Sequence, residues 1–316
     1  MLSHEDNELL SRVGPGTPAG QLLRRYWQVV GAATELPDEK PKKRLRVLGE
    51  DLVLFRDRGG TYGLVAEHCS HRGASLFYGF IEEDGIRCAY HGWKYDACGK
   101  CLEQPFETPE IGFREKIRHP AYPVVKLNGL LFAYMGPPEK KPILPKWDLL
   151  VRQDGVRRVE ICQVLRCNWF QAMENSVDPF HTYYLHSHTL RLKGGSSQST
   201  YHYQAVKNVA FELVVHPSWA GIQKQRFFAG EDVPVEAPHP LIFPNLLFVP
   251  VRAGYAMHFR TPIDDTSTQI YHLRFRPTKD GSIPAQPEDP PVEFVGTRNE
   301  AGEFHLGDFA SQDHMA

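Results

Sequence analysis

The sequence has little net charge and no long apolar stretch. Its 316 residues include 36 Lys and Arg against 38 Asp and Glu, and a formal net charge of −2 gives no basic field that would attract nucleic acid or an acidic membrane. No positively charged start leads into an apolar run, and no stretch of about twenty apolar residues occurs. We therefore expect a cytoplasmic protein of one large or two medium domains, without a nucleic-acid or membrane partner.

Cysteine is scarce as well. With six cysteines and no targeting signal, free thiols are favoured over disulfides. Cys98-Gly99-Lys100-Cys101 has the spacing of a redox dithiol or of half a zinc site. No second Cys pair of this kind completes a zinc site, so we interpret the segment as a glycine turn after a strand.

Two short segments each combine one Cys with one His. They are Cys69-Ser70-His71 and Cys88-Ala89-Tyr90-His91. Two loops that each give one thiolate and one imidazole suit a tetrahedral zinc or a [2Fe–2S] cluster in which Cys holds one iron and His the other. A structural zinc usually takes pairs of like ligands, so the mixed pairs favour the cluster. We interpret His68, beside the first pair, as a loop residue.

At these four positions the sequence resembles the Rieske iron–sulfur family, with its Cys-x-His and Cys-x2-His pattern. Respiratory members carry a further Cys in each loop, and these two pair as a disulfide; the equivalent positions here are Ala74 and Tyr90. The resemblance is therefore to the ferredoxin or oxygenase branch. The cluster ligands that it implies are Cys69, His71, Cys88 and His91.

Local patterns divide the chain into three segments. Residues 1–40 predict two helices that pack on the body, capped at Ser3 and at Thr17-Pro18, the second continuing to Trp27. Residues 41–140 contain short β-rich runs between glycine turns, which indicate hairpins of a small antiparallel sheet from which the cluster loops project. A charged, proline-rich stretch ends this segment.

Residues 141–316 predict a larger antiparallel sheet, and residues 284–291 a polar, proline-rich loop. The fold class expected is α+β, with an N-terminal all-β Rieske domain and a C-terminal catalytic domain whose sheet curves around helices (helix-grip type). The β-rich runs are residues 157–165, 201–206, 210–215, 223–228, 241–249, 255–261 and 269–275.

One convincing helix is predicted in the second half, from Trp169 to His186. Two histidines and one carboxylate on one face of Fe(II) leave positions open for O2 and a substrate beside it. His181 and His186 are five residues apart, about 140° around a straight helix, so they would not converge there. Asp178-Pro179 supplies a local break, and a helix end or a widened turn would bring them together.

Spacing alone is a weak signal, because His pairs in helices are often surface or core residues. Downstream of the Rieske pattern, however, Asp178, His181 and His186 match the Asp-x2-His-x4-His iron motif of Rieske non-haem iron oxygenases. Asn175 also stands in its usual place, and we count it with Asp178 as catalytic. His188 has the wrong spacing and is interpreted as a surface residue or a neighbour of the ligands.

The resemblance implies a third iron ligand, a carboxylate on a later helix. Asp313 is the closest match, Asp308 is the rival, and a frayed terminal Asp is the plain alternative. Phthalate-dioxygenase-like oxygenases and related aromatic O-demethylases carry more chain beyond this point. We therefore expect the C-terminus to be incomplete.

Asp178 has two interpretations. It can cap a helix that starts at Pro179. In the family, the matching Asp hydrogen-bonds an iron-ligating His and links it to a Rieske His of the neighbouring subunit, which fixes the tautomer of the ligand. We favour this bridging role.

The function implied is that of the terminal oxygenase (α) subunit of a Rieske system in aromatic hydrocarbon catabolism. Electrons from a separate NAD(P)H-dependent reductase of flavin and ferredoxin type would pass from the cluster through Asp178 to Fe(II), which activates O2. The expected reaction is hydroxylation of an aromatic, carboxylated substrate, in a homo-oligomer arranged as a head-to-tail trimer. Ring dihydroxylation and O-demethylation of a methoxylated aromatic both remain open, and a Rieske electron-transfer protein without catalysis is the alternative of another class.

A substrate carboxylate calls for a basic partner in an apolar pocket. Each candidate for this role is more simply a surface charge. They are Arg191, Lys193, Lys207, Arg226, Arg252 and Arg260.

Overall fold

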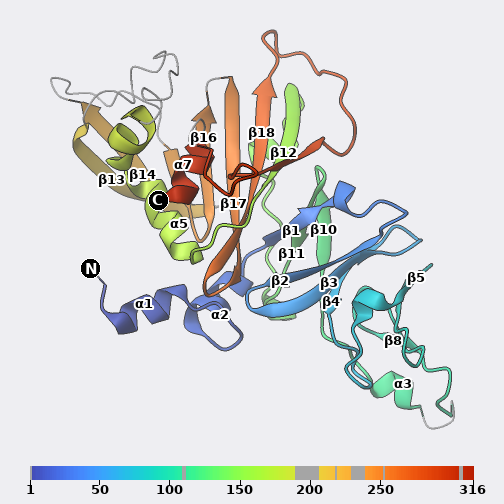
Figure 1. The fold of residues 1–316 in the computed structure, drawn as a ribbon. Coiled ribbons are helices and arrows are strands. Elements are labelled where there is room, and N and C mark those ends of the chain that lie inside the picture. Colours follow the sequence, from blue (N-terminus) through green and yellow to red (C-terminus); the bar gives the residue numbers. More distant parts are fainter. Residues whose placement is uncertain are drawn as a thin grey trace. The chain divides into compact units, whose positions relative to one another are not determined.

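The computed structural model describes residues 2–108, 112–188, 206–217, 219–228, 239–251, 253–305 and 309–316. The chain forms two compact units (Figure 1). Unit 1 comprises Met1–Lys146, Thr261–Asp265 and Gln286–Pro291, and unit 2 comprises Trp147–Arg260, Thr266–Ala285 and Val292–Ala316. The divisions expected at residues 40 and 140 stay predictions. Among the described helices, none is both long and apolar enough to cross a membrane.

Unit 1 begins with the two predicted helices. The side chain of Ser3 accepts the Asp6 N–H at the start of α1 (His4–Ser11), and that of Thr17 accepts the Gly20 N–H at the start of α2 (Pro18–Arg24). Both caps are confirmed. The extension of the second helix to Trp27 is wrong, because the chain leaves α2 at Arg24 and enters β1 (Gln28–Ala32), a fully buried strand that pairs with β11 (Leu130–Ala133).

Unit 1 contains the short antiparallel strands that the glycine-punctuated pattern predicted, but they form three small sheets instead of one. The first is β1, β11 and β10 (Val124–Leu127). The second is β2 (Lys42–Val47), β3 (Glu50–Arg56), β4 (Tyr62–Ala66) and β9 (Ala121–Tyr122). The third is β5 (Phe80–Glu82), β6 (Gly85–Arg87), β7 (Lys94–Tyr95) and β8 (Cys101–Glu103), and the short helix α3 (Phe113–Lys116) follows it.

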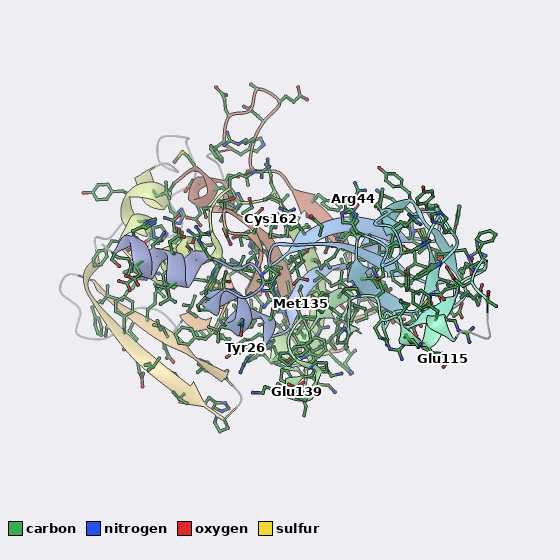
Figure 2. The ribbon with its side chains drawn as sticks, turned by 90° about the horizontal axis from the view of Figure 1, so that it is seen from below. Tyr26, Arg44, Glu115, Met135, Glu139 and Cys162 are labelled. Carbon is green, nitrogen blue, oxygen red and sulfur yellow. The ribbon has the colours of Figure 1, made fainter. Side chains whose placement is uncertain are left out.

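The second and third sheets share an apolar core that surrounds the two cluster cysteines. Phe55, Leu76 and Tyr95 are fully buried in it, with Cys69 and Cys88 packed among them. On the outer side, the guanidinium of Arg44 (labelled in Figure 2) stacks over the Phe77 ring at 4.7 Å. The cluster loops therefore start from a rigid, close-packed base.

Unit 2 is built on an eight-stranded sheet with the order β13-β14-β15-β16-β17-β18-β12-β19. Pairs from β13 to β17 and the pair β18–β12 are antiparallel, and β19 runs parallel to β12. The strands are β12 (Gly155–Cys162), β13 (Val206–His216), β14 (Trp219–Phe228), β15 (His239–Ile242), β16 (Leu246–Val251), β17 (Gly254–Asp264), β18 (Ser267–Pro277) and β19 (Val292–Val295).

Most of the predicted strands of unit 2 are present. The run 241–249 is instead two strands around a turn at Phe243–Asn245, where Pro244 has no N–H to offer a ladder. Residues 201–205 of another predicted run lie outside the described residues, and β19 was not predicted. The polar loop 284–291 is irregular, as expected.

The predicted helix Trp169–His186 is two elements. Helix α5 (Trp169–Val177) ends at Asp178, and a π-helical turn, η5 (Thr182–His188), follows. With α7 (Phe309–Met315), these elements lie together against one face of the sheet (Figure 1). The helix break at Asp178-Pro179 and the widened turn are the two features that we expected to bring the two histidines together.

Candidate metal centres

The backbone closes both cluster loops in the same way. The Gly73 N–H donates to the Cys69 carbonyl at 2.9 Å. The Gly92 N–H donates to the Cys88 carbonyl at 3.1 Å. Both glycines have positive φ, 69° and 72°, which favours glycine at these positions.

The thiols lie inside and the imidazoles lie nearer the surface. Cys69 and Cys88 are 4% and 3% exposed. The rings of His71 and His91 lie edge to face with centroids 4.6 Å apart, and both residues are partly exposed. His71 also stacks on Trp93 at 4.5 Å, which fixes its orientation. This arrangement suits a cluster with an inner, Cys-ligated iron and an outer, His-ligated iron.

Tyr95 is a neighbour of the predicted cluster ligands that the sequence did not reveal. Its hydroxyl lies 3.2 Å from Cys69 Sγ in the core, and burial followed by the Cys69 contact raises its pKa, so that it stays protonated. Hydrogen bonds to cluster sulfurs adjust the reduction potential. No sequence motif marks Tyr95; the contact appears only when the strand Lys94–Tyr95 is placed next to the first cluster loop.

Asp178 makes contacts that agree with both interpretations. Its carboxylate accepts the N–H groups of Phe180 at 2.8 Å and His181 at 3.2 Å, as a helix cap does, and Oδ2 also lies 3.0 Å from His181 Nδ1. Burial raises the pKa of Asp178, but the Phe180 N–H and His181 outweigh burial and lower it. The contact to His181 agrees with a bridging role; the link to a neighbouring subunit stays a prediction.

His181, His186 and Asp313 converge. Their ligand atoms all lie within 4.8 Å of one another. Asp313 Oδ1 is 3.3 Å from His186 Nε2 and 3.8 Å from His181 Nε2, and the two rings are 5.1 Å apart. In a π-helical turn the bonds link residue i to i+5, which brings residues five apart onto nearly one face. The turn therefore resolves the 140° separation of a straight helix.

Each triad histidine is oriented through its other ring nitrogen. His186 Nδ1 lies 2.8 Å from Oε1 of Gln312, which is fully buried, while Asp178 engages His181. Both Nε2 atoms are thereby left for Asp313 and a metal. Burial lowers the pKa of His181 and keeps it neutral, whereas at His186 Asp313 and Gln312 overcome burial and raise the pKa. Gln312 was missed, although it directly precedes Asp313.

Other predicted residues have different positions. Asn175 is half-buried on α5, and the structure gives its side chain no polar contact with the triad, so its role stays a prediction. Asp308 and the basic candidates Arg191, Lys193 and Arg252 lie outside the described residues, as do the side chains of Lys207 and His188.

Two basic candidates are not the surface charges that we expected. Arg226 and Arg260 are 6% and 5% exposed, because both point from the sheet toward the α5 side of unit 2. Lys224, which the sequence did not single out, joins them and donates to the Ser176 carbonyl of α5 at 2.7 Å. Alternation on β14 puts Lys224 and Arg226 on the same face.

Both donor sets fit iron. His71 Nδ1 is buried without a hydrogen-bond partner, as a metal-ligating nitrogen would be. In the described part of the chain, His181, His186 and Asp313 converge tightly enough for a single ion, and two loops that each give one Cys and one His suit a two-iron cluster. Two histidines and one carboxylate are the facial triad of non-haem Fe(II) sites.

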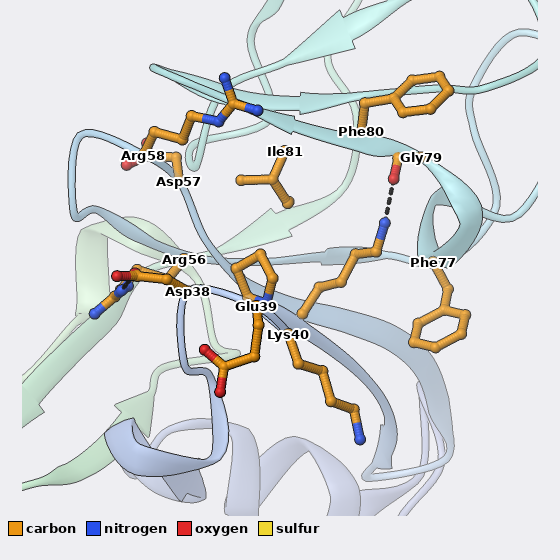
Figure 3. Close-up of a pocket in the computed structure, with 12 residues that line it drawn as sticks. Asp38, Glu39, Lys40, Arg56, Asp57, Arg58, Phe77, Gly79, Phe80 and Ile81 are labelled. Atoms are coloured by element: carbon orange, nitrogen blue, oxygen red, sulfur yellow. Dashed lines mark hydrogen bonds and ion pairs between the residues drawn. The ribbon is translucent and has the colours of Figure 1, made fainter.

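Unit 1 also has a pocket of about 650 Å³, which is lined by other residues than the two donor sets (Figure 3). Charged side chains line most of it, including an Arg56–Asp38 ion pair and Lys42, whose ammonium donates to the Gly79 carbonyl. Burial lowers the pKa of Lys42. None of the predicted site residues lines this pocket.

The fold and the two donor sets together define a class, that of Rieske non-haem iron oxygenases. Residues 26–123 match the family described as Rieske [2Fe-2S] domain. The whole chain is 38% identical to the 5,5'-dehydrodivanillate O-demethylase oxygenase subunit of Sphingobium sp. (strain NBRC 103272 / SYK-6) and covers 73% of it. It is 33% identical to the phthalate 4,5-dioxygenase oxygenase subunit of Pseudomonas putida, over 86% of this chain and 64% of that one.

A solved structure has the same fold. The terminal oxygenase of carbazole 1,9a-dioxygenase from Nocardioides aromaticivorans IC177 matches with a TM-score of 0.63 and 20% identity, over 86% of this chain and 78% of that one. The chain belongs to the oxygenase subunits of the Rieske oxygenase family. The predicted family, fold class and cofactors, a Rieske [2Fe–2S] cluster and a mononuclear iron, are thereby confirmed.

Proposed function

We propose that the protein is the terminal oxygenase of a Rieske system, which uses O2 to hydroxylate an aromatic carboxylate. The observation that carries the proposal is the convergence of His181, His186 and Asp313 within 4.8 Å, with Asp178 hydrogen-bonded behind His181. The relatives' names support the substrate class, since dehydrodivanillate and phthalate are both aromatic carboxylates.

Each residue has a definite task in this proposal. Cys69, Cys88, His71 and His91 hold the [2Fe–2S] cluster, which supplies single electrons. His181, His186 and Asp313 hold Fe(II), which when bound supplies O2 activation. Asp178 and Gln312 fix the neutral tautomers of the two histidines, so that each presents Nε2. A separate NAD(P)H-dependent reductase of flavin and ferredoxin type is the electron source, and the oligomer is a head-to-tail trimer.

O-demethylation of a methoxylated aromatic is the second candidate, because the relative that is 38% identical is named as an O-demethylase. The products separate the two reactions. Demethylation releases formaldehyde and leaves a phenol, whereas ring dihydroxylation leaves a diol that contains both atoms of O2. The experiment is product analysis with labelled O2, after a panel of aromatic acids and methoxylated aromatic acids is supplied with a generic reductase.

His181→Ala tests the catalytic assignment. We expect the parent to hold about three irons per chain and the variant about two, with the cluster EPR signal kept and product formation lost. His305→Ala, which removes an exposed histidine of the same unit, is the matched control and should behave as the parent. Two irons in the parent would favour the electron-transfer protein instead, and full product from the His181 variant would show that the assignment of His181 to the catalytic iron is wrong.

A further inference from the structure

Three cationic side chains of the unit 2 sheet reach the segment that holds the triad. Lys224 Nζ donates to the Ser176 carbonyl at 2.7 Å, Arg226 Nη1 to Thr182 Oγ1 at 3.2 Å, and Arg260 Nη1 to the Met173 sulfur at 3.5 Å. Asp313 exerts an attractive field on both Lys224 and Arg260. The cations therefore lie beside the site at which the substrate must react.

Two of these cations have no counter-ion among the described residues. Across the described ranges, no carboxylate lies within 4 Å of a side-chain nitrogen of Lys224 or Arg260. The nearby anions Asp178 and Asp313 are already engaged with the two triad histidines. A cation that is buried without an anion is destabilised, and burial accordingly lowers the pKa of Arg260 to about 10 and of the partly buried Lys224 to about 8.

Arg260 also has unused donors. Its Nε is buried without a hydrogen-bond partner, and the whole residue is only 5% exposed. The sulfur that Nη1 contacts is only a weak acceptor. Two residues earlier on the same face of β17, His258 Nε2 is likewise buried and unpartnered. A donor of Arg260 that is buried without an acceptor calls for a polar partner.

We propose that Arg260 and Lys224 form an anion subsite that holds the carboxylate of the substrate next to the iron triad. This inference rests on the proposed function and names the residues that give it its substrate class. The Arg260 guanidinium can take a carboxylate in a two-bond arrangement, and Lys224 adds a point charge. The bound carboxylate supplies the counter-charge that both side chains lack, and it orients the ring toward the triad.

A purely structural role makes a different prediction. Lys224 would then serve only to cap α5, and Arg260 only to fill space beneath Met173. Removing either residue would change stability but not the preference for an acid over its neutral analogue. The preference is therefore the quantity to measure.

The experiment compares acids with their carboxamides. Benzoate, phthalate, 3-methoxybenzoate and 3-phenoxybenzoate, each beside its amide, are titrated by calorimetry into the full chain loaded with cluster and iron. We expect the parent to bind at least one acid about 10- to 100-fold more tightly than its amide, the range for hydrogen bonds to a charged group. In Arg260→Gln this preference should fall to about threefold or less, and in Lys224→Gln it should fall partway.

Arg276→Gln is the matched control, because Arg276 is an exposed arginine of the same sheet; it should keep the parental preference. If Arg260→Gln does not fold, Lys224→Gln decides, and an undiminished preference in it overturns the proposal. Equal binding of every acid and amide by the parent, or no binding of any acid, also overturns it.

Product analysis of the same samples separates this inference from the proposed function. Selective acid binding without any oxidised product contradicts the proposed function and leaves the anion subsite standing. Equal oxidation of acids and amides leaves the oxygenase standing and contradicts the anion subsite.

Discussion

The two triad histidines are held by acceptors of different charge. Asp178 gives His181 a carboxylate at 3.0 Å, and Gln312 gives His186 a neutral amide oxygen at 2.8 Å. Gln312 is completely buried, so an apolar side chain of similar size in its place would leave His186 Nδ1 without an acceptor. An outer hydrogen bond of this kind fixes the tautomer and typically changes metal affinity by about 10- to 100-fold when lost.

Gln312→Leu should therefore weaken Fe(II) binding at the triad by about 10- to 100-fold, because His186 loses the partner that keeps Nε2 free for the metal. Gln312→Glu retains an acceptor and should restore most of the affinity. Titration of the iron-depleted protein with Co(II), followed by its visible absorption, measures this without turnover. The unchanged cluster spectrum is the internal control, and parental affinity in Gln312→Leu would show that Gln312 has only a packing role.

At the scale of elements, the interruption after α5 decides the geometry of the iron site. Asp178 ends the helix, Pro179 removes an N–H, and the π-helical turn Thr182–His188 places His181 and His186 together. The end of α5 also depends on tertiary structure. Its Ser176 carbonyl, which has no helical partner, accepts from Lys224 on β14.

Lys224→Met should stabilise the protein at neutral pH. A fall in the Lys224 pKa from about 10.5 to about 8 means that keeping the ammonium charged costs the fold about 3 kcal/mol, and its bond to Ser176 returns about 1 kcal/mol. The net gain on removal is about 2 kcal/mol, a rise of a few degrees in melting temperature.

The lowered pKa of Lys224 also determines how the free energy of unfolding changes with pH. Below pH 8 both the folded and the unfolded protein hold the Lys224 proton, and the penalty is complete. Between pH 8 and 10.5 the unfolded state binds more protons, so the parent gains stability as pH rises. The charged groups acting on Lys224 are Arg226, Asp178, Arg260 and Asp313. Thermal melting from pH 7 to 10 should show the advantage of Lys224→Met shrinking; an advantage that grows with pH would refute it.

At the scale of the whole molecule, each active unit of the proposed head-to-tail oligomer contains residues of two chains. The cluster of one subunit would then serve the iron of its neighbour. In such an arrangement, two inactive variants can complement each other, because a heterologous interface joins different parts of the two partners.

Cys88→Ser removes a cluster ligand and leaves the triad, and His181→Ala removes a triad ligand and leaves the cluster. Each variant alone should be inactive. Equal co-expression should restore about a quarter of parental activity, the share of head-to-tail contacts that join an intact cluster to an intact iron. Mixing the purified oligomers without subunit exchange is the control. No activity after co-expression would mean that electrons stay within one subunit.

The short motifs in the sequence, together with the family that they resemble, predicted the metal chemistry. Cys69 to His91 and Asp178 to His186 carry their ligands at fixed local spacings, because a loop or a helical turn presents neighbours in sequence to one atom. Local signals also located the helix caps at Ser3 and Thr17 and the break at Asp178-Pro179. The period-two runs predicted the antiparallel sheet of unit 2.

Contacts between distant segments could be decided only by the tertiary structure. Gln312 and Asp313 meet His186 across 126 and 127 residues, and Tyr95 meets Cys69 across 26. The burial of Lys224, Arg226 and Arg260 depends on which face of the sheet α5 covers, which no local pattern records. For this reason the sequence could predict the ligands of the metals, whereas packing alone revealed the groups that contact them and the cations beside them.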